Sequence, residues 1–157
     1  MKTLLSILCI TFYVSLNSQP SSSLVWHTDV LKAVDIAIKE KKPLFLFFTG
    51  SDWCGWCKRL QNEVFTKPQF QSWASKNVVL VELDFPRRTQ LDPKLQQQNF
   101  EIAQIFGVRG YPTIWFVIPS KTDTQINFAK LGSTGYIAGG PEVWIQEANR
   151  ILQSAQH

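Results

Sequence analysis

The sequence LFLFFTGSDWCGWC, residues 44–57, joins an unbroken apolar run to a pair of cysteines. The run from Leu44 to Phe48 does not alternate with polar residues, which predicts a strand covered on both faces by helices. Gly50 and Ser51 end this strand, and a helical pattern follows them. We therefore expect the two cysteines where a buried strand passes into a helix.

Apolar patterns on either side predict the rest of an α/β domain. The predicted order is a strand at 24–26, a helix capped by Thr28 or Asp29, the strand at 44–48, helices after Trp53 and at 68–76, a strand at 77–84, a helix stopped by Gly107, strands at 113–118 and 125–131, and a helix opened by Pro141. We expect the first helix to bury Leu31, Val34 and Ile38, and residues 119–123 to form the turn of the final hairpin. This order describes one α/β sandwich layered helix, sheet, helix.

Length and composition limit the chain to one substantial core. It has 157 residues, of which 45% are apolar and 13% aromatic. The formal net charge of +4 comes from 16 basic and 12 acidic residues. Basic residues occur in scattered pairs without a nucleic-acid-binding motif, so we expect solvated faces and no nucleic-acid partner. We also expect the protein to be a monomer.

The N-terminus has the layout of a signal peptide. Met1-Lys2-Thr3 precedes an apolar run from Leu4 to Leu16, and small polar residues follow. The run is shorter than the roughly 20 apolar residues that a spanning helix needs. We expect a signal peptide at 1–18, a linker at 19–23 and a domain at 24–157, in a periplasmic or secreted protein. An uncleaved membrane anchor is the alternative.

The three cysteines divide between these segments. Cys9 falls inside the signal segment, so the mature chain keeps Cys54 and Cys57. In an oxidising compartment a matched pair can form a disulfide, whereas an unpaired thiol is a liability. The count fits one functional pair.

The position of Cys54 favours thiol chemistry. Free N–H groups at a helix N-terminus stabilise a thiolate, and the pKa of cysteines in such settings falls from about 8.5 to roughly 3.5–7.5. We therefore expect Cys54 to be the nucleophile. Cys57, one helical turn deeper, can resolve a mixed disulfide by exchange. Gly55 leaves room for the close bend, and Lys58 adds a small favourable charge.

A structural bridge and a metal site are the other roles that a cysteine pair can have. A structural bridge over four residues would remove little entropy from the unfolded chain. A zinc site needs four ligands, and only His27 and His157 could supplement the pair; both are expected to be ordinary surface or terminal histidines. Two thiolates can hold Cu(I), so copper handling stays as an alternative.

Two motifs then identify a family. Residues 53–58, Trp-Cys-Gly-Trp-Cys-Lys, resemble the active site of thioredoxins and disulfide isomerases, and residues 107–113, Gly-Val-Arg-Gly-Tyr-Pro-Thr, resemble the loop that carries the family's cis-proline. The resemblance covers about residues 24–152, and the chain is similar to exported bacterial members of the family. It implies the thioredoxin fold: a central mixed sheet of about five strands flanked by helices on both faces.

The resemblance also implies roles for individual residues. Cys54 and Cys57 would form the redox-active disulfide, with no bound cofactor or metal. Tyr111 and Pro112 would bind an extended substrate segment by strand addition. The residues that would support the active site are Trp53, Gly55, Trp56 and Lys58.

Two departures from thioredoxins limit this transfer of roles. Trp56 replaces the proline between the cysteines, a position that tunes reduction potential in the family, so a strongly reducing character does not follow. Phe48 stands where thioredoxins bury an acid. Proton transfer to and from Cys57 would then use another group, Glu82, Asp84 or water, although plain solvation at the strand end is the preferred explanation for both acids.

The predicted function is an exported thiol-disulfide oxidoreductase that acts on protein thiols or disulfides as a reductant or isomerase. Its redox partner is unidentified, and a membrane electron donor is one candidate. A thioredoxin-fold binding module or copper-handling protein with little turnover is the alternative. The loop at Arg87 and Arg88 is expected to overhang the same sheet edge as the cysteines, where it either selects partners or is simply solvated.

Overall fold

Strand β2 (Leu44–Thr49) lies at the centre of the sheet in a computed structural model that describes residues 24–154. All six of its residues are buried, as its unbroken apolar sequence predicts. It pairs in parallel with β3 (Val79–Asp84) and antiparallel with β4 (Thr113–Lys121). The strand order is β1-β3-β2-β4-β5, which confirms the predicted mixed five-stranded sheet.

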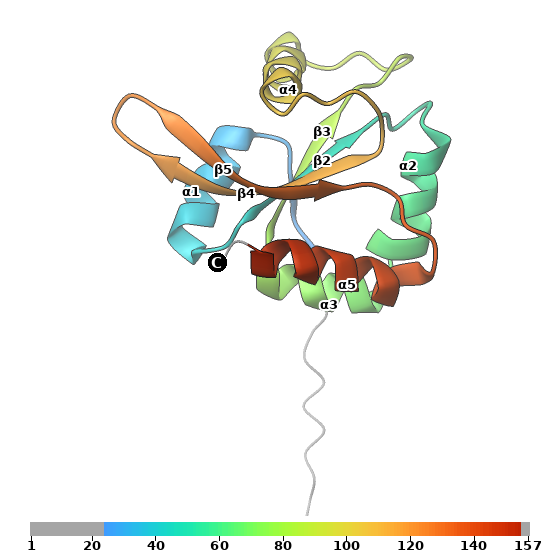
Figure 1. Cartoon of the computed structure of the whole chain (residues 1–157). Coiled ribbons are helices and arrows are strands. Elements are labelled where there is room, and N and C mark those ends of the chain that lie inside the picture. The colour runs from blue at the N-terminus through green and yellow to red at the C-terminus, as the bar shows by residue number, and fades with distance from the viewer. Residues whose placement is uncertain (1–23, 155–157) are drawn as a thin grey trace, which may run out of the picture.

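The other elements follow the predicted succession closely (Figure 1). They are β1 (Trp26–His27), α1 (Val30–Glu40), α2 (Gly55–Leu60), the π-helical turn η1 (Gln61–Phe65), α3 (Pro68–Asn77), α4 (Pro93–Ile105), β5 (Ile126–Thr134) and α5 (Gly140–Gln153). The predicted signal peptide at 1–18 and linker at 19–23 lie outside the described residues, as does His157. No helix within residues 24–154 is long and apolar enough to cross a membrane.

Alternation along β2 divides the core into two layers. Phe45 and Phe47 pack on the side covered by α2, η1, α3 and α5, whereas Leu46 and Phe48 pack on the side covered by α1 and α4. Figure 1 shows α3 and α5 side by side beneath the sheet and α4 on the other side. The first layer is aromatic, and Phe65, Phe70 and Trp144 meet within it. Both cysteines of the motif belong to this layer.

The inner face of α1 differs from the expected one. Asp29 caps the helix by accepting a hydrogen bond from the Lys32 N–H, as predicted. Val34 is buried, but Leu31 is 60% exposed and Ile38 is 41% exposed. The buried residues of α1 are Val30, Ala33, Val34 and Ala37. The expectation was wrong because it gave weight to the largest apolar side chains, while small alanines let the helix approach the sheet closely.

The final hairpin is longer than predicted. Residues 119–121, expected in the turn, continue β4, and Pro119 pairs with Phe128 of β5. β4 stops pairing with β2 after Val117, which lies opposite Leu44. Beyond Val117, β4 pairs with β5 alone. A proline is tolerated there because no bond to β2 is lost. The turn is therefore confined to residues between Lys121 and Ile126.

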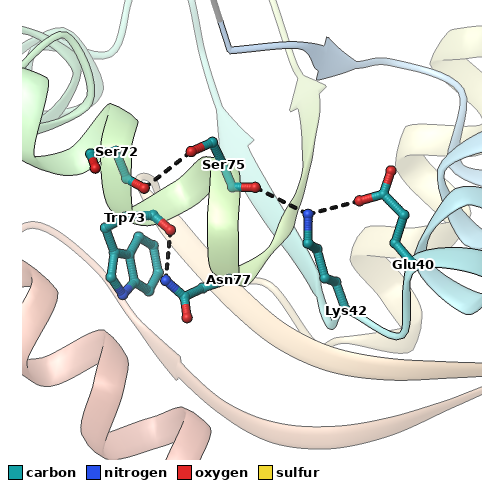
Figure 2. Close-up of polar contacts among 6 residues, drawn as sticks. All are labelled: Glu40, Lys42, Ser72, Trp73, Ser75 and Asn77. Atoms are coloured by element: carbon teal, nitrogen blue, oxygen red, sulfur yellow. Dashed lines mark hydrogen bonds and ion pairs between the residues drawn. The ribbon is translucent and has the colours of Figure 1, made fainter. Parts of the chain in front are cut away.

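The C-terminal end of α3 is tied to the segment that follows α1 (Figure 2). Lys42 Nζ donates to the Ser75 carbonyl at 3.0 Å and to Glu40 Oε2 at 2.8 Å. The Asn77 side chain donates to the Trp73 carbonyl at 2.7 Å. Carbonyl groups in the last turn of a helix lack intrahelical partners, and a cation near them is favourable. These contacts stabilise the end of the helix that leads into β3.

We expect Trp144→Ala to destabilise the protein by about 3–5 kcal/mol, the usual range for emptying a large aromatic site in a core. Trp144 is fully buried, and its Nε1 donates to the Gly135 carbonyl at 3.0 Å. The free energy of unfolding in urea would measure the change. Phe100→Ala is the control, because Phe100 is 54% exposed and its loss should cost less than about 1 kcal/mol. Similar losses in the two variants would contradict the packing described here.

Candidate active site

Cys54 and Cys57 lie at the junction between β2 and α2, as the sequence predicts. Cys54 is the N-cap of α2, and its Sγ accepts a hydrogen bond from the Cys57 N–H at 3.2 Å. The two residues form a disulfide, with their Cα atoms 5.3 Å apart. Cys54 keeps 5% of its surface exposed and Cys57 none. The first sulfur is therefore the outer one, at the beginning of a helix, and the second lies in the core.

A tight turn delivers the chain from β2 to Cys54. The Gly50 carbonyl accepts hydrogen bonds from the Trp53 N–H at 3.2 Å and the Cys54 N–H at 2.8 Å. A side chain at Gly50 would collide with the indole of Trp53. Glycine is therefore required for the Trp53 ring to fold back over the turn.

Asp52 attaches this turn to the loop after β3. Its carboxylate accepts hydrogen bonds from the backbone N–H groups of Arg87, Arg88 and Thr89, at distances from 2.6 to 3.2 Å. The bond from Arg87 is the main cause that lowers the pKa of Asp52 below its ordinary value. Sequence analysis did not single out Asp52, although a short acidic side chain in a loop is a common acceptor for backbone N–H groups.

Trp53 makes the second link to that loop. Its Nε1 donates to the Phe85 carbonyl at 2.8 Å, and its ring lies edge-on to Tyr111, with centroids 5.6 Å apart. Tyr111 also packs on Phe85 at 5.3 Å, and burial raises the pKa of its hydroxyl. The Arg87 guanidinium lies 3.8 Å from the centre of the Trp53 ring. One wall of the site is therefore built from three separate segments of the chain.

The Tyr111–Pro112 peptide bond is cis, as the second motif predicts. β4 begins directly after it and runs antiparallel to β2, with Thr113 opposite Phe48. Pro112 consequently lies at the edge of the sheet from which the chain continues to Cys54. A side chain at Gly135 would come within 3.1 Å of the Pro112 carbonyl, so the loop after β5 passes close by.

Trp56 forms the other wall. It is 55% exposed, and its ring lies 5.1 Å from that of Tyr136. The Arg59 guanidinium lies 5.4 Å from the Trp56 ring and 5.3 Å from the Tyr136 ring. Glu63 accepts hydrogen bonds from Arg59 at 2.7 Å and from the Tyr136 hydroxyl at 2.6 Å. The Tyr136 bond, with that from Arg59, lowers the pKa of Glu63, and the same Glu63 contact raises the pKa of Tyr136.

The remaining supporting residues lie at the surface of α2. Gly55 is its first residue and is exposed, with open space where a side chain would be, so the expectation that a glycine makes room for the bend here was wrong. Lys58 is exposed too, and its Nζ lies 3.5 Å from the Asp52 carbonyl. Neither residue contacts the aromatic walls through a hydrogen bond.

The acids named as proton acceptors have different surroundings. Phe48 packs in the layer opposite the cysteines. Asp84 is engaged by Ser51, whose N–H and hydroxyl donate to it at 2.8 and 2.6 Å. Glu82 lines a hollow of about 560 Å³ beside Phe47 and Gln61, and burial, with a smaller effect of Asp84, raises the pKa of Glu82. Its role in proton transfer stays a prediction.

Within residues 24–154 no three His, Cys, Asp or Glu side chains come together in a group that could hold a metal ion. The imidazole of His27 is on β1, at the opposite side of β3 from β2.

Comparison with known proteins agrees with this description. Residues 30–122 match the thioredoxin-like domain family. The chain is 29% identical to the disulfide bond reductase DsbH of Chlamydia pneumoniae over 119 residues, covering 75% of this chain and 71% of DsbH. It is 27% identical to the thioredoxin-related protein DsbJ of the same organism over 157 residues, which is 98% of this chain but only 44% of DsbJ.

Solved structures show the same architecture. A DsbH oxidoreductase superposes with a TM-score of 0.76 and 25% identity, covering 91% of this chain and 95% of that one. A thioredoxin from Thermus thermophilus superposes with a TM-score of 0.61 at 17% identity, covering 83% and 88% of the two chains, and supports the fold alone.

We expect Asp52→Asn to loosen the loop after β3 and to make stability less dependent on pH. Because the folded state lowers the pKa of Asp52, its contribution to stability is full above its unfolded value of about 3.9 and is lost as pH falls through the folded value. At pH 7 the variant should unfold at lower urea concentration than the wild type, with faster hydrogen exchange at Arg87, Arg88 and Thr89. Below pH 3 the difference should shrink.

Asp123→Asn is the control, because Asp123 is exposed in the β4–β5 turn. This variant should match the wild type at both pH values. A stability difference for Asp52→Asn that stays constant from pH 7 to pH 3 would show that the carboxylate charge is not what fixes the loop.

Proposed function

The chain belongs to the thioredoxin-like domain family and is a thiol-disulfide oxidoreductase; we propose that it reduces or isomerises disulfides of exported proteins, with Cys54 as nucleophile and Cys57 as resolving thiol. One observation carries the assignment of roles. Cys54, at the N-cap of α2, keeps 5% of its residue surface exposed, whereas Cys57 is fully buried. A substrate disulfide can therefore approach Cys54 and not Cys57.

The proposed reaction is a pair of thiol-disulfide exchanges. In the reduced protein the Cys54 thiolate attacks one sulfur of the substrate disulfide, that S–S bond breaks, and the leaving thiolate takes up a proton. Cys57, deprotonated, then attacks Cys54 Sγ, releases the second substrate thiolate and closes the Cys54–Cys57 disulfide. Two electrons pass to the substrate, and a dithiol donor must return them before the next turnover. In isomerisation the substrate instead releases Cys54 by forming a new disulfide of its own.

The surroundings of the disulfide support docking of an extended segment. The backbone at Tyr111 and Pro112 lies at the sheet edge beside Cys54 and offers hydrogen-bonding groups for strand addition. Trp56 presents an exposed aromatic surface on the other side. We assign Tyr111 and Pro112 to substrate binding, and Trp53, Gly55, Trp56 and Lys58 to support of the site.

Export belongs to the same proposal and rests on the sequence of residues 1–18, which has the layout of a signal peptide. A periplasmic or secreted protein of this kind takes electrons from a partner rather than from the cytosolic thiol pool. A membrane electron donor is the partner that we propose. The two thiol-disulfide exchanges of the proposed reaction use the cysteine pair and need no bound cofactor.

Reduction of insulin by dithiothreitol tests the roles of the two cysteines. We expect Cys54→Ser to reduce the rate to the uncatalysed background, because Cys57, the other cysteine among the described residues, is fully buried. Cys57→Ser should also lose turnover but accumulate a mixed disulfide at Cys54, visible as a mass increase that is lost under reduction.

Wild-type rates in Cys54→Ser would refute its role. If the wild-type protein itself fails to accelerate insulin reduction, the binding-module and copper-handling alternatives gain support, and Cu(I) titration of the reduced protein would separate these two.

The residue between the cysteines provides a further test. Thioredoxins, which are strongly reducing, have proline at the position of Trp56, so we expect Trp56→Pro to lower the reduction potential. A change of about 30 mV corresponds to a tenfold change in the equilibrium with a reference dithiol, and we expect at least this much. Redox titration against glutathione would measure it, with Trp56→Phe as the control that keeps an aromatic ring. An equal or higher potential in Trp56→Pro would contradict the prediction.

A further inference from the structure

Each tryptophan that flanks Cys54 carries an arginine on its indole ring. Arg59 lies over Trp56, and Arg87 lies over Trp53. The two arginines differ in their charge partners. Arg59 is paired with Glu63 at 2.7 Å, whereas no ion pair within residues 24–154 involves Arg87. The guanidinium on the wall formed by Trp53, the neighbour of Cys54 in sequence, therefore has no ion-pair partner among the described residues.

Two acids at this edge of the sheet, Asp52 and Asp84, use their carboxylates for other hydrogen bonds. The Asp52 carboxylate is turned to the backbone N–H groups of residues 87–89, and Asp84 is turned to Ser51. The other charged side chains on the loop after β3 and on the cis-proline loop are Arg88, Asp92 and Arg109, all exposed, and the Asp92 carboxylate is turned to the N–H groups of Lys94 and Leu95 at the start of α4. Arg109 lies three residues before the cis-proline that we assign to substrate docking. A segment bound there would therefore lie near arginines of both loops.

The position of Arg87 is fixed before any substrate arrives. Its backbone N–H is held by Asp52, its guanidinium is stacked on Trp53 at 3.8 Å, and Trp53 is held by the Phe85 carbonyl. A stacked guanidinium keeps its N–H donors free at the edges of its plane, and little rotamer freedom remains to be lost on binding. This geometry suits two parallel hydrogen bonds to a planar carboxylate.

We propose that Arg87 binds an Asp or Glu side chain next to the disulfide of the protein substrate, so that this protein acts preferentially on disulfides in acidic segments. The proposal rests on the disulfide-exchange function and adds the class of substrate. The partner is an extended polypeptide with a carboxylate close to the attacked cysteine. The positive charges of Arg88 and Arg109 strengthen the same preference at longer range, by electrostatic attraction of acidic segments.

Two disulfide-linked peptides that differ in one residue test this preference. They carry Glu or Lys next to the cysteine, with a fluorescent reporter released on reduction, and a third peptide carries Gln. The measured quantity is the ratio of kcat/KM for the Glu peptide to that for the Lys peptide, each divided by its rate with dithiothreitol alone to remove differences in intrinsic reactivity. We expect a ratio of about 3 to 10 for the wild type at low salt, as for one well-placed charge contact.

Substitution should then change this ratio in a defined way. Arg87→Gln should bring it close to 1, and Arg87→Glu should invert it in favour of the Lys peptide. Arg150→Gln is the control, since Arg150 is an exposed arginine of α5 paired with Glu147. This control should keep the wild-type ratio. In 1 M salt, where the Debye length falls to about 3 Å, the wild-type ratio should decrease.

The measured ratios of kcat/KM either support or overturn the binding of an acidic side chain by Arg87. A wild-type ratio near 1, or a ratio that Arg87→Glu leaves unchanged, overturns the proposal. Equal losses for the Glu and Lys peptides in Arg87→Gln would overturn it too, because they would show that Arg87 acts on the Cys54 thiol or on folding. Failure of the disulfide-exchange function is distinguishable, because the wild type would then not reduce the Gln peptide either.

Discussion

The hydrogen bond from the Cys57 N–H to Cys54 Sγ, at the junction of β2 with α2, is the contact around which the site is organised. It makes a sulfur the cap of a helix, which places that sulfur among N–H groups and leaves its neighbour one turn deeper in the core. β2 is buried along its whole length, so the position of the junction is fixed by the packing of both layers. The aromatic layer of Phe45, Phe65 and Trp144 therefore serves the site as a support.

The edge of the sheet determines what the sulfurs meet. β2 and β3 are parallel and end together, so the loop after β3 lies beside the turn before Cys54, and Asp52 and Trp53 bind it there. β4 is antiparallel to β2 and begins at the same edge of the sheet. The cis-proline loop therefore lies on the opposite side of β2 from β3. A mixed sheet thus gathers three distant segments at one point. This convergence also explains how an arginine far from the motif in sequence comes to flank the disulfide.

Much of the fold follows from local pattern. The apolar run of β2, the Asp29 cap and the Gly107 stop are encoded in a few adjacent residues, and the structure has them where the sequence predicts. The errors arose where the outcome depends on a neighbour. The buried face of α1 depends on how closely alanines let it approach the sheet, and the length of the hairpin depends on where β2 stops pairing with β4.

The sequence by itself determined the strand-to-helix junction, the order of the two cysteines and the proline loop, because each is written in contiguous residues with strong conformational preferences. Only the tertiary structure decided what surrounds Trp53 and Trp56. The bond from Trp53 to Phe85 spans 32 residues, and that from Tyr136 to Glu63 spans 73. No local preference specifies such pairs. They form because the register of the sheet brings loop ends together, and this register also leaves Arg87 without a carboxylate partner in the described chain while Arg59 has one.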